Sequence, residues 1–277
     1  MLDPFDCYEL CVQSPRHVVS FLRAVHGNEP RILHEDFCGT AAVSRRWCAD
    51  AASRGETARA VCVDIDARSL DRAAMLARAD GTERSVVFVR ADVLQPVRPP
   101  PNPLPPGGGA DVVFVGNFSI GYIHTRPALV AYLRHARERL ARGASGFGGG
   151  VFVCDTYGGA GAFRLGAIER NHPSRGRELI RYSWVHEDAD PITAMVTNSI
   201  SFRVVLDGEV VAEYPRAFEY RWRLWSIAEL REAMLEAGFV SVEVHKDVNL
   251  APEEPPRPVS DPRDLGEDWV VLVVARA

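Results

Sequence analysis

The chain has 277 residues, a hydrophobic fraction of 47% and a net charge of −5 at pH 7. This length allows one large domain or two small ones, and an acidic chain without a basic stripe argues against nucleic-acid binding. No apolar run approaches about 20 residues and the N-terminus lacks a signal peptide, so we expect a cytoplasmic protein without a membrane partner. The cysteine pair Cys7 and Cys11 lacks further ligands at metal-site spacing, so no metal is expected.

The first part of the chain predicts strands that alternate with helices. Residues 95–109 interrupt this pattern with seven prolines and three consecutive glycines. Such a segment is neither helix nor central strand, so we expect a surface loop. In chain order, the expected elements are helices at 3–13 and 15–26, a strand at 31–35, a helix at 41–52, a strand at 58–64, a helix at 67–79, strands at 85–90 and 111–115, a helix at 125–140 and a strand at 151–154.

The pattern changes in the second part of the chain. Strands are expected at 179–185, 194–206 and 210–220 without helices between them, and Asp207-Gly208 is a hairpin signal. Ser226 and Glu229 form a capping box that opens a helix at 226–237. Strands at 239–244 and 269–274 follow, separated by a polar, proline-rich stretch.

Alternating strands and helices predict a parallel sheet that is covered on both faces. The last two strands have no helix between them, so the final strand can run antiparallel. We therefore expect one α/β domain over residues 1–277, built as a three-layer Rossmann-like sandwich. A helical segment covers residues 1–27, and an antiparallel β insertion over residues 166–222 serves as a lid or a dimer surface.

Acidic side chains follow three of the predicted parallel strands. Ligands of an open α/β sheet bind beyond the carboxyl ends of its strands, so these side chains are expected in one site. Asp64 can accept both hydroxyls of a ribose, and Asp92 can accept from an adenine amino group, with the amide of Val93 beside it. A carboxylate at the first turn suits a cationic amino group, and the adjacent Glu35 and Asp36 would repel a pyrophosphate.

These residues also have structural interpretations, which remain open. Glu35 and Asp36 could cap the helix that follows them, and Asp66 is expected to cap its own helix. Asp92 could be a turn residue. Asn117 and Ser119 could satisfy backbone groups at a strand end.

The chain resembles the class I S-adenosylmethionine-dependent methyltransferases. The resemblance rests on Glu35 with Cys38-Gly39-Thr40-Ala41, Val63-Asp64-Ile65-Asp66, Ala91-Asp92-Val93, Gly116-Asn117-Phe118-Ser119 and the unpaired final strand. It implies a seven-stranded sheet in order 3-2-1-4-5-7-6 with an antiparallel last strand, and S-adenosylmethionine as the cofactor. The expected cofactor-binding residues are Glu35, Phe37, Cys38, Gly39, Thr40, Ala41, Asp64, Ile65, Asp92, Val93 and Asn117.

Two residues of the first turn depart from the family, which usually has glycine at the positions of Phe37 and Ala41. A dinucleotide site also needs glycines there, so a nicotinamide-dependent oxidoreductase is disfavoured. A non-catalytic protein that kept the fold and only binds the cofactor, or serves as an interaction protein, is a further alternative.

The substrate side rests on fewer signals. Gly116-Asn117-Phe118-Ser119 is similar to the Gly-Asn-Ser stretch of small-molecule N-methyltransferases, which favours an amine over a hydroxyl as methyl acceptor. His124 and Tyr157 are the candidate catalytic residues, although His124 could equally pack at the start of a helix. A homodimer is possible. The expected substrate-binding residues are Asn117, Ser119, Tyr122, Arg181, Trp184 and Arg221, although alternation in a half-buried sheet explains most of the insertion residues as well.

Overall fold

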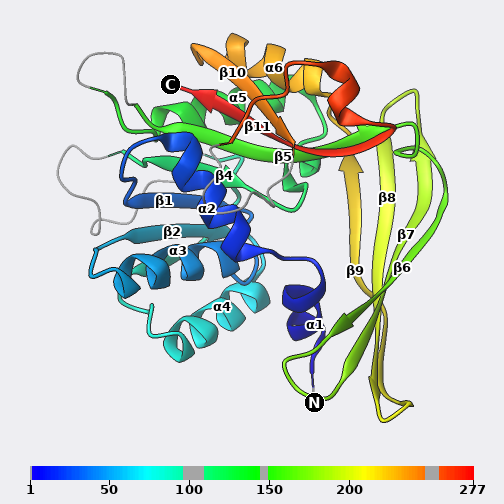
Figure 1. The fold of residues 1–277 in the computed structure, drawn as a ribbon. Coiled ribbons are helices and arrows are strands. Elements are labelled where there is room, and N and C mark those ends of the chain that lie inside the picture. The colour runs from blue at the N-terminus through cyan, green and yellow to red at the C-terminus, as the bar shows by residue number, and fades with distance from the viewer. Residues whose placement is uncertain (1, 96–108, 144–148, 247–255) are drawn as a thin grey trace.

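The computed structural model describes residues 2–95, 109–143, 149–246 and 256–277 (Figure 1). Residues 96–108, the larger part of the predicted proline-rich loop, lie outside the described residues. None of the helices in the described ranges is long and apolar enough to cross a bilayer.

The helices follow the order expected from the sequence. Their bounds are α1 Pro4–Cys11, α2 Pro15–His26, α3 Ala42–Ser53, α4 Ala67–Ala79, α5 Arg126–Glu138 and α6 Ile227–Glu236, with short 3-10 helices η1 at Ser119–Tyr122 and η2 at Pro262–Leu265.

The strands in the described ranges form two sheets. The main sheet contains β1 Ile32–Asp36, β2 Arg59–Asp64, β3 Val86–Arg90, β4 Val112–Val115, β5 Val151–Gly159, β10 Ser241–Lys246 and β11 Asp268–Arg276. The second sheet contains β6 Gly166–Pro173, β7 Leu179–Asp190, β8 Met195–Leu206 and β9 Glu209–Arg223.

The main sheet confirms the predicted topology. Over the described residues its order is β10-β11-β5-β4-β1-β2-β3, which is 3-2-1-4-5-7-6 when its strands are counted along the chain. The strands from β3 to β5 pair in parallel, whereas β11 is antiparallel to both β5 and β10. An antiparallel neighbour needs no helical crossover connection, and the described residues between β10 and β11 contain only the short 3-10 helix η2.

Helices cover both faces of this sheet, as Figure 1 shows. On β4, Val113 faces a core cluster with Leu133 of α5 and Leu230 of α6. The next residue along the strand, Phe114, faces the opposite cluster, which contains Trp47 of α3. The alternation of strand side chains therefore buries this strand on both sides, as the continuous apolar run Val112–Val115 predicts.

Helices α4 and α6 begin at the capping residues that the sequence predicts. The carboxylate of Asp66 accepts hydrogen bonds from the amides of Arg68 and Ser69 at the start of α4. Ser226 and Glu229 form the predicted capping box of α6. Each cap satisfies backbone amides that have no partner within the helix.

The β insertion contains one strand more than predicted. Asp207 and Gly208 have φ angles of +52° and +91°, so the expected hairpin joins β8 and β9. The additional strand is β6, whose side chains are nearly all exposed and whose sequence has little apolar alternation. The strand β5 also runs to Gly159, beyond the predicted end at residue 154, because β11 pairs with it along its whole length.

Helix α1 lies between helix α4 and the second sheet. Tyr8 packs on Phe218 of β9 with ring centroids 4.9 Å apart. On its other side, Arg72 of α4 forms ion pairs with Asp3 and Asp6 at the start of α1. Figure 1 shows α1 between α4 and the second sheet. The N-terminal helix thus contacts both α4 and the second sheet.

Candidate functional site

The turn between β1 and α3 has an unusual backbone. Phe37 and Gly39 have φ angles of +54°, and Ala41 has a φ angle of +55°. Glycine adopts this left-handed conformation readily, whereas a residue with a side chain loses about 1–2 kcal/mol. Phe37 and Ala41 therefore keep a glycine-like backbone at a cost in stability, a pattern that is found at ligand-binding sites.

Glu35 lies at the end of β1 with 6% of its surface exposed. Its Oε2 accepts a hydrogen bond of 2.9 Å from the amide of Ser44 in the first turn of α3. Burial raises the pKa of Glu35 to about 7, although the bonds from Ser44 act in the opposite direction. Glu35 therefore caps α3 and also places a titratable carboxyl at the turn.

Asp36 faces the other side of the sheet. Its fully buried carboxylate accepts hydrogen bonds from the Tyr132 hydroxyl, at 2.6 Å, and from Nη1 of Arg139, at 2.9 Å. Burial alone would raise the pKa of Asp36, but the Arg139 guanidinium outweighs it and holds the pKa below its usual value. The two adjacent acids do not act together at the turn, because neighbouring residues of a strand point to opposite faces.

Asp64 connects the ends of β2 and β1. Its Oδ2 accepts from the amide of Gly39 at 2.7 Å, and its Oδ1 accepts from the amide of Asp66 at 2.9 Å. Each carboxylate oxygen keeps a second lone pair for a further donor. The neighbouring Ile65 is 67% exposed and presents an apolar side chain beside this carboxylate.

The remaining residues of the first turn point inward. The side chains of Cys38 and Thr40 are buried, so a ligand at this turn would meet their backbone. The Thr40 hydroxyl donates to Glu9 of α1, and Nη2 of Arg45 contacts the same carboxylate at 2.7 Å. Helix α1 is therefore fastened directly to the turn.

Asp92 and Val93 follow β3. The Oδ1 of Asp92 accepts from the amide of Leu94 at 2.9 Å, so one carboxylate oxygen takes part in a turn. Val93 is buried. The turn interpretation of Asp92 is thus confirmed, and among the described residues no hydrogen bond to its Oδ2 is formed.

A second left-handed turn follows β4. Asn117 and Phe118 have φ angles of +54° and +61°. The carboxylate of Asp155 on β5 accepts from both of their amides, at 2.8 and 2.7 Å. Burial raises the pKa of Asp155 to about 7. Asp155 fixes this turn, a role that its position directly after an apolar strand segment did not reveal.

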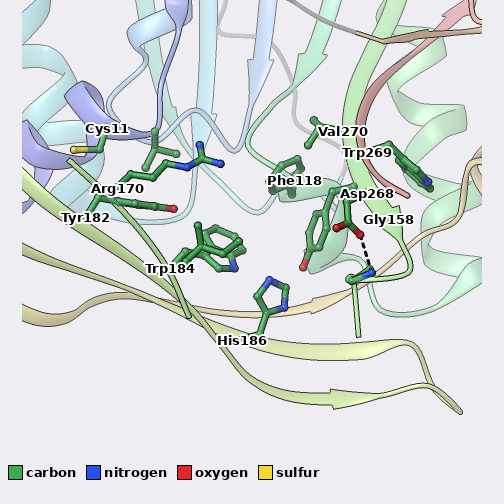
Figure 2. Close-up of a pocket in the computed structure, with 15 residues that line it drawn as sticks. Cys11, Phe118, Gly158, Arg170, Tyr182, Trp184, His186, Asp268, Trp269 and Val270 are labelled. Atoms are coloured by element: carbon green, nitrogen blue, oxygen red, sulfur yellow. Dashed lines mark hydrogen bonds between the residues drawn. The ribbon is translucent and has the colours of Figure 1, made fainter. Parts of the chain in front are cut away.

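A cavity of about 430 Å³ lies beside the second turn (Figure 2). Its wall combines Phe118, the end of β5, the inner face of β6 and β7, the end of α1 and the start of β11. Of the predicted substrate and catalytic residues, Tyr157 and Trp184 line it. Those that do not are Asn117, Ser119, Tyr122, His124, Arg181 and Arg221.

Aromatic rings form one corner of this cavity. The Phe118 and Tyr157 rings lie 4.7 Å apart, and Trp184 meets each of them edge-on at 6.5 and 6.4 Å. The Tyr157 hydroxyl accepts from Nδ2 of Asn198 at 3.3 Å, and burial raises the pKa of Tyr157 to about 12. Burial lowers the pKa of His186, which also lines the wall, so this imidazole is neutral at pH 7.

The other predicted residues lie around the cavity. Tyr122 stacks on Phe37 at 6.0 Å and also contacts Trp222, so it lies between the first turn and the second sheet. His124 is exposed, and its Nε2 lies 3.0 Å from the carbonyl oxygen of Arg221. The catalytic role of His124 stays a prediction.

Both predicted substrate arginines have exposed side chains. Arg181 and Arg221 are neighbours of Tyr182 and Tyr220, which point into the buried cluster of the second sheet. The arginine that reaches the cavity is Arg170, on the strand that the sequence did not predict. The pairing of β6 with β7 directs the Arg170 side chain toward the cavity. The sequence of β6 has no apolar alternation that would indicate which of its side chains face inward.

No protein-family model and no curated protein matches this sequence. Solved structures do match over nearly the whole chain. A S-adenosylmethionine-dependent methyltransferase from Clostridium acetobutylicum is 15% identical, with a TM-score of 0.67 over 97% of this chain and 95% of that one. A sugar N-methyltransferase from Streptoalloteichus is 16% identical, with a TM-score of 0.62 over 100% and 94%.

An amino pentose methyltransferase from Micromonospora echinaspora, solved with S-adenosylmethionine bound, is 14% identical, with a TM-score of 0.62 over 100% of this chain and 98% of that one. These likenesses, together with the strand order, show that the chain has the class I fold of S-adenosylmethionine-dependent methyltransferases. At such identities the likenesses establish the fold alone.

Proposed function

We propose that the protein transfers a methyl group from S-adenosylmethionine to a small-molecule nucleophile, and that this nucleophile is an amine. The observation that carries the proposal is the pair of left-handed turns at the ends of β1 and β4, one held by Asp64 and the other by Asp155. Phe118 of the second turn lines the cavity, so the proposed substrate site would adjoin the proposed cofactor site.

The residues of the first turn suit this cofactor. Asp64 would hold the ribose hydroxyls, Ile65 would lie against the adenine, and Asp92 would accept from the adenine amino group. The backbone of residues 37–41 would bind the methionine part, with the Glu35 carboxyl near its cationic amino group. The left-handed Phe37 and Ala41 support this assignment, because the backbone strain at both residues is retained in the fold.

The cofactor supplies a methyl group on a sulfonium; the acceptor's lone pair forms the new bond while the C–S electron pair stays on sulfur. The protein's own residues then position the acceptor. Phe118, Tyr157 and Trp184 would hold it, and His186 provides a neutral imidazole that can take the proton leaving the amine. Tyr157 stays protonated near neutral pH, so it acts as a hydrogen-bonding group.

Two considerations favour an amine over a hydroxyl. A neutral amine attacks without prior loss of a proton, and a strong base is therefore unnecessary. The resulting ammonium is a cation, which aromatic faces such as those of the cavity corner stabilise. Two structural neighbours are a sugar N-methyltransferase and an amino pentose methyltransferase, and this supports an amine as the acceptor.

Calorimetry with S-adenosylmethionine, S-adenosylhomocysteine, NAD and NADP tests the proposal. We expect both sulfur ligands to bind and neither dinucleotide to do so. Absence of sulfur-ligand binding would refute the proposal, and binding of NAD or NADP instead would favour the oxidoreductase alternative. Binding without turnover on a broad amine and phenol panel would favour the non-catalytic alternative.

The homodimer and the cytoplasmic location stay predictions. The outer face of the second sheet would supply the dimer surface, and light scattering across a concentration series measures the mass of the assembly. A single-chain mass at all concentrations would reject the dimer.

The titration of Glu35 gives a prediction about stability. Its folded-state pKa of about 7 exceeds the ordinary value of about 4.3. The protonated Glu35 carboxyl therefore makes its full contribution to the free energy of unfolding below about pH 4. This contribution is lost as the pH rises through about 7. We expect wild type to lose unfolding free energy relative to Glu35→Gln between about pH 4 and pH 8, measured by urea denaturation.

Glu35→Gln keeps an oxygen that can accept from the Ser44 amide, so the comparison isolates ionisation. Glu29→Gln is the control, because Glu29 is 89% exposed beside Arg31. The control should follow wild type at every pH. A difference between wild type and Glu35→Gln that does not vary with pH would contradict the assignment.

A further inference from the structure

Arg170 is a cation of the cavity wall that has no ionic partner among the described residues. Figure 2 shows its guanidinium directed into the cavity, toward Phe118. Among the residues that the structure describes, no carboxylate forms a salt bridge with Arg170. By contrast, Arg45, Arg72 and Arg139, which join the elements around the site, each contact at least one carboxylate.

Strand register explains why Arg170 reaches the cavity. In the β6–β7 ladder, Arg170 pairs with Tyr182 and Ile168 pairs with Trp184. All four of these residues line the cavity, as the period of two in a strand requires. Arg181 belongs to the alternate set, and its exposed side chain lies outside this wall.

The wall has a charge at each of two separate places. Figure 2 shows Asp268 on the opposite side of the cavity from Arg170. The Oδ1 of Asp268 accepts a hydrogen bond of 2.7 Å from the amide of Gly161, so this carboxylate is already partly satisfied. The aromatic corner lies between them. Arg170 is therefore the cationic side chain of this wall, and Asp268 is a carboxylate on the opposite side with its Oδ2 still able to accept.

We propose that Arg170 binds an anionic group of the substrate, a carboxylate or a phosphate, while the substrate's amine lies against Phe118 and Tyr157. The proposal rests on the function proposed above and names the substrate class: amines that also carry an anion. Guanidinium presents two parallel N–H donors that match the two oxygens of either group, which gives both affinity and orientation. Anchoring the anion at β6 places the amine beside the turn that Asp155 holds.

The first test compares paired amines on the full chain saturated with S-adenosylhomocysteine. In each pair an anionic amine is matched with its neutral analogue, as in phenylalanine with phenylalaninamide and glucosamine 6-phosphate with glucosamine. Calorimetry should show tighter binding of the anionic members of one series by about tenfold or more. The series that binds identifies the anion as carboxylate or phosphate. Equal affinities within the pairs, or no binding of any anionic member, would overturn the proposal.

The second test compares substitutions of Arg170, which lines the cavity, with a substitution of Arg181, which does not. Arg170→Ala should weaken binding of the anionic member by about 10- to 100-fold and leave the neutral member within about twofold. Arg170→Lys should fall between, because it keeps the charge without the two-donor geometry. Arg181→Ala is the matched control and should behave as wild type. Equal losses for both members in Arg170→Ala would show a structural role and would reject the anchor.

Cofactor binding separates this proposal from the function on which it rests. The affinity for S-adenosylhomocysteine is measured first in wild type and in Arg170→Ala, and both should bind equally. A wild type that does not bind it loses the proposed function. A wild type that binds it but does not distinguish anionic from neutral amines loses only the Arg170 anchor.

Discussion

Asp64→Ala is expected to weaken S-adenosylhomocysteine binding by about 100-fold or more. The ribose hydroxyls of the ligand would lose their carboxylate acceptor. Hydrogen bonds to a charged group contribute about 1.5–3 kcal/mol each. The substitution also removes the acceptor for the Gly39 amide, which loosens the turn and lowers affinity in the same direction. Isothermal calorimetry on the purified full chain measures the effect.

Asp66→Ala is the matched control for this experiment. Asp66 is two residues away and caps α4 through the amides of Arg68 and Ser69. Its loss should cost about 1 kcal/mol of unfolding free energy, as is usual for a helix cap, and change the affinity by less than about threefold. If Asp64→Ala bound the ligand as wild type does, the ribose assignment would be wrong.

Arg139→Ala should cause the largest loss of stability, about 3–5 kcal/mol of unfolding free energy. Among the residues that the structure describes, the Tyr132 hydroxyl would then be the only hydrogen-bond partner of the fully buried Asp36 carboxylate. An uncompensated buried charge is costly because the interior cannot solvate it. Chemical denaturation monitored by tryptophan fluorescence gives the difference from wild type.

The exposed pair of Arg177 and Asp207 provides the comparison. Their side chains are 77% and 64% exposed, so Arg177→Ala should change stability by less than about 0.5 kcal/mol. The double variant Asp36→Asn with Arg139→Met should recover part of the loss, since it removes both buried charges. A double variant as unstable as Arg139→Ala would show that packing, and not the uncompensated charge, causes the effect.

The contrast between Asp36 and Glu35 shows how closely a site depends on strand facing. The sequence places two acids side by side and suggests that they act together on a ligand. In the sheet, Glu35 faces the turn and α3, whereas Asp36 faces α5 and pairs with Arg139. Successive side chains of a strand point to opposite faces. Glu35 and Asp36 are adjacent in the sequence, yet one carboxyl lies at the turn and the other forms an ion pair in the core.

The second sheet shows the same dependence for the substrate residues. Trp184 and Tyr157 were predicted from their type and position, and both line the cavity. Arg181 was predicted for its charge, yet Arg170 is the arginine that enters the wall. The nearly fully exposed β6 carries no apolar alternation, so local pattern could not identify the strand or its inner face.

The sequence by itself determined the order of strands and helices, the caps at Asp66 and Ser226 and the acids at the strand ends, because apolar period, capping and turn chemistry are local properties. The strand order and the antiparallel last strand followed from these and from the resemblance. Only the tertiary structure decided which side chains share a cavity. Phe118, Arg170 and Asp268 are far apart in the chain. They line one cavity because β11 pairs with β5 and because the β6–β7 hairpin lies against the turn after β4.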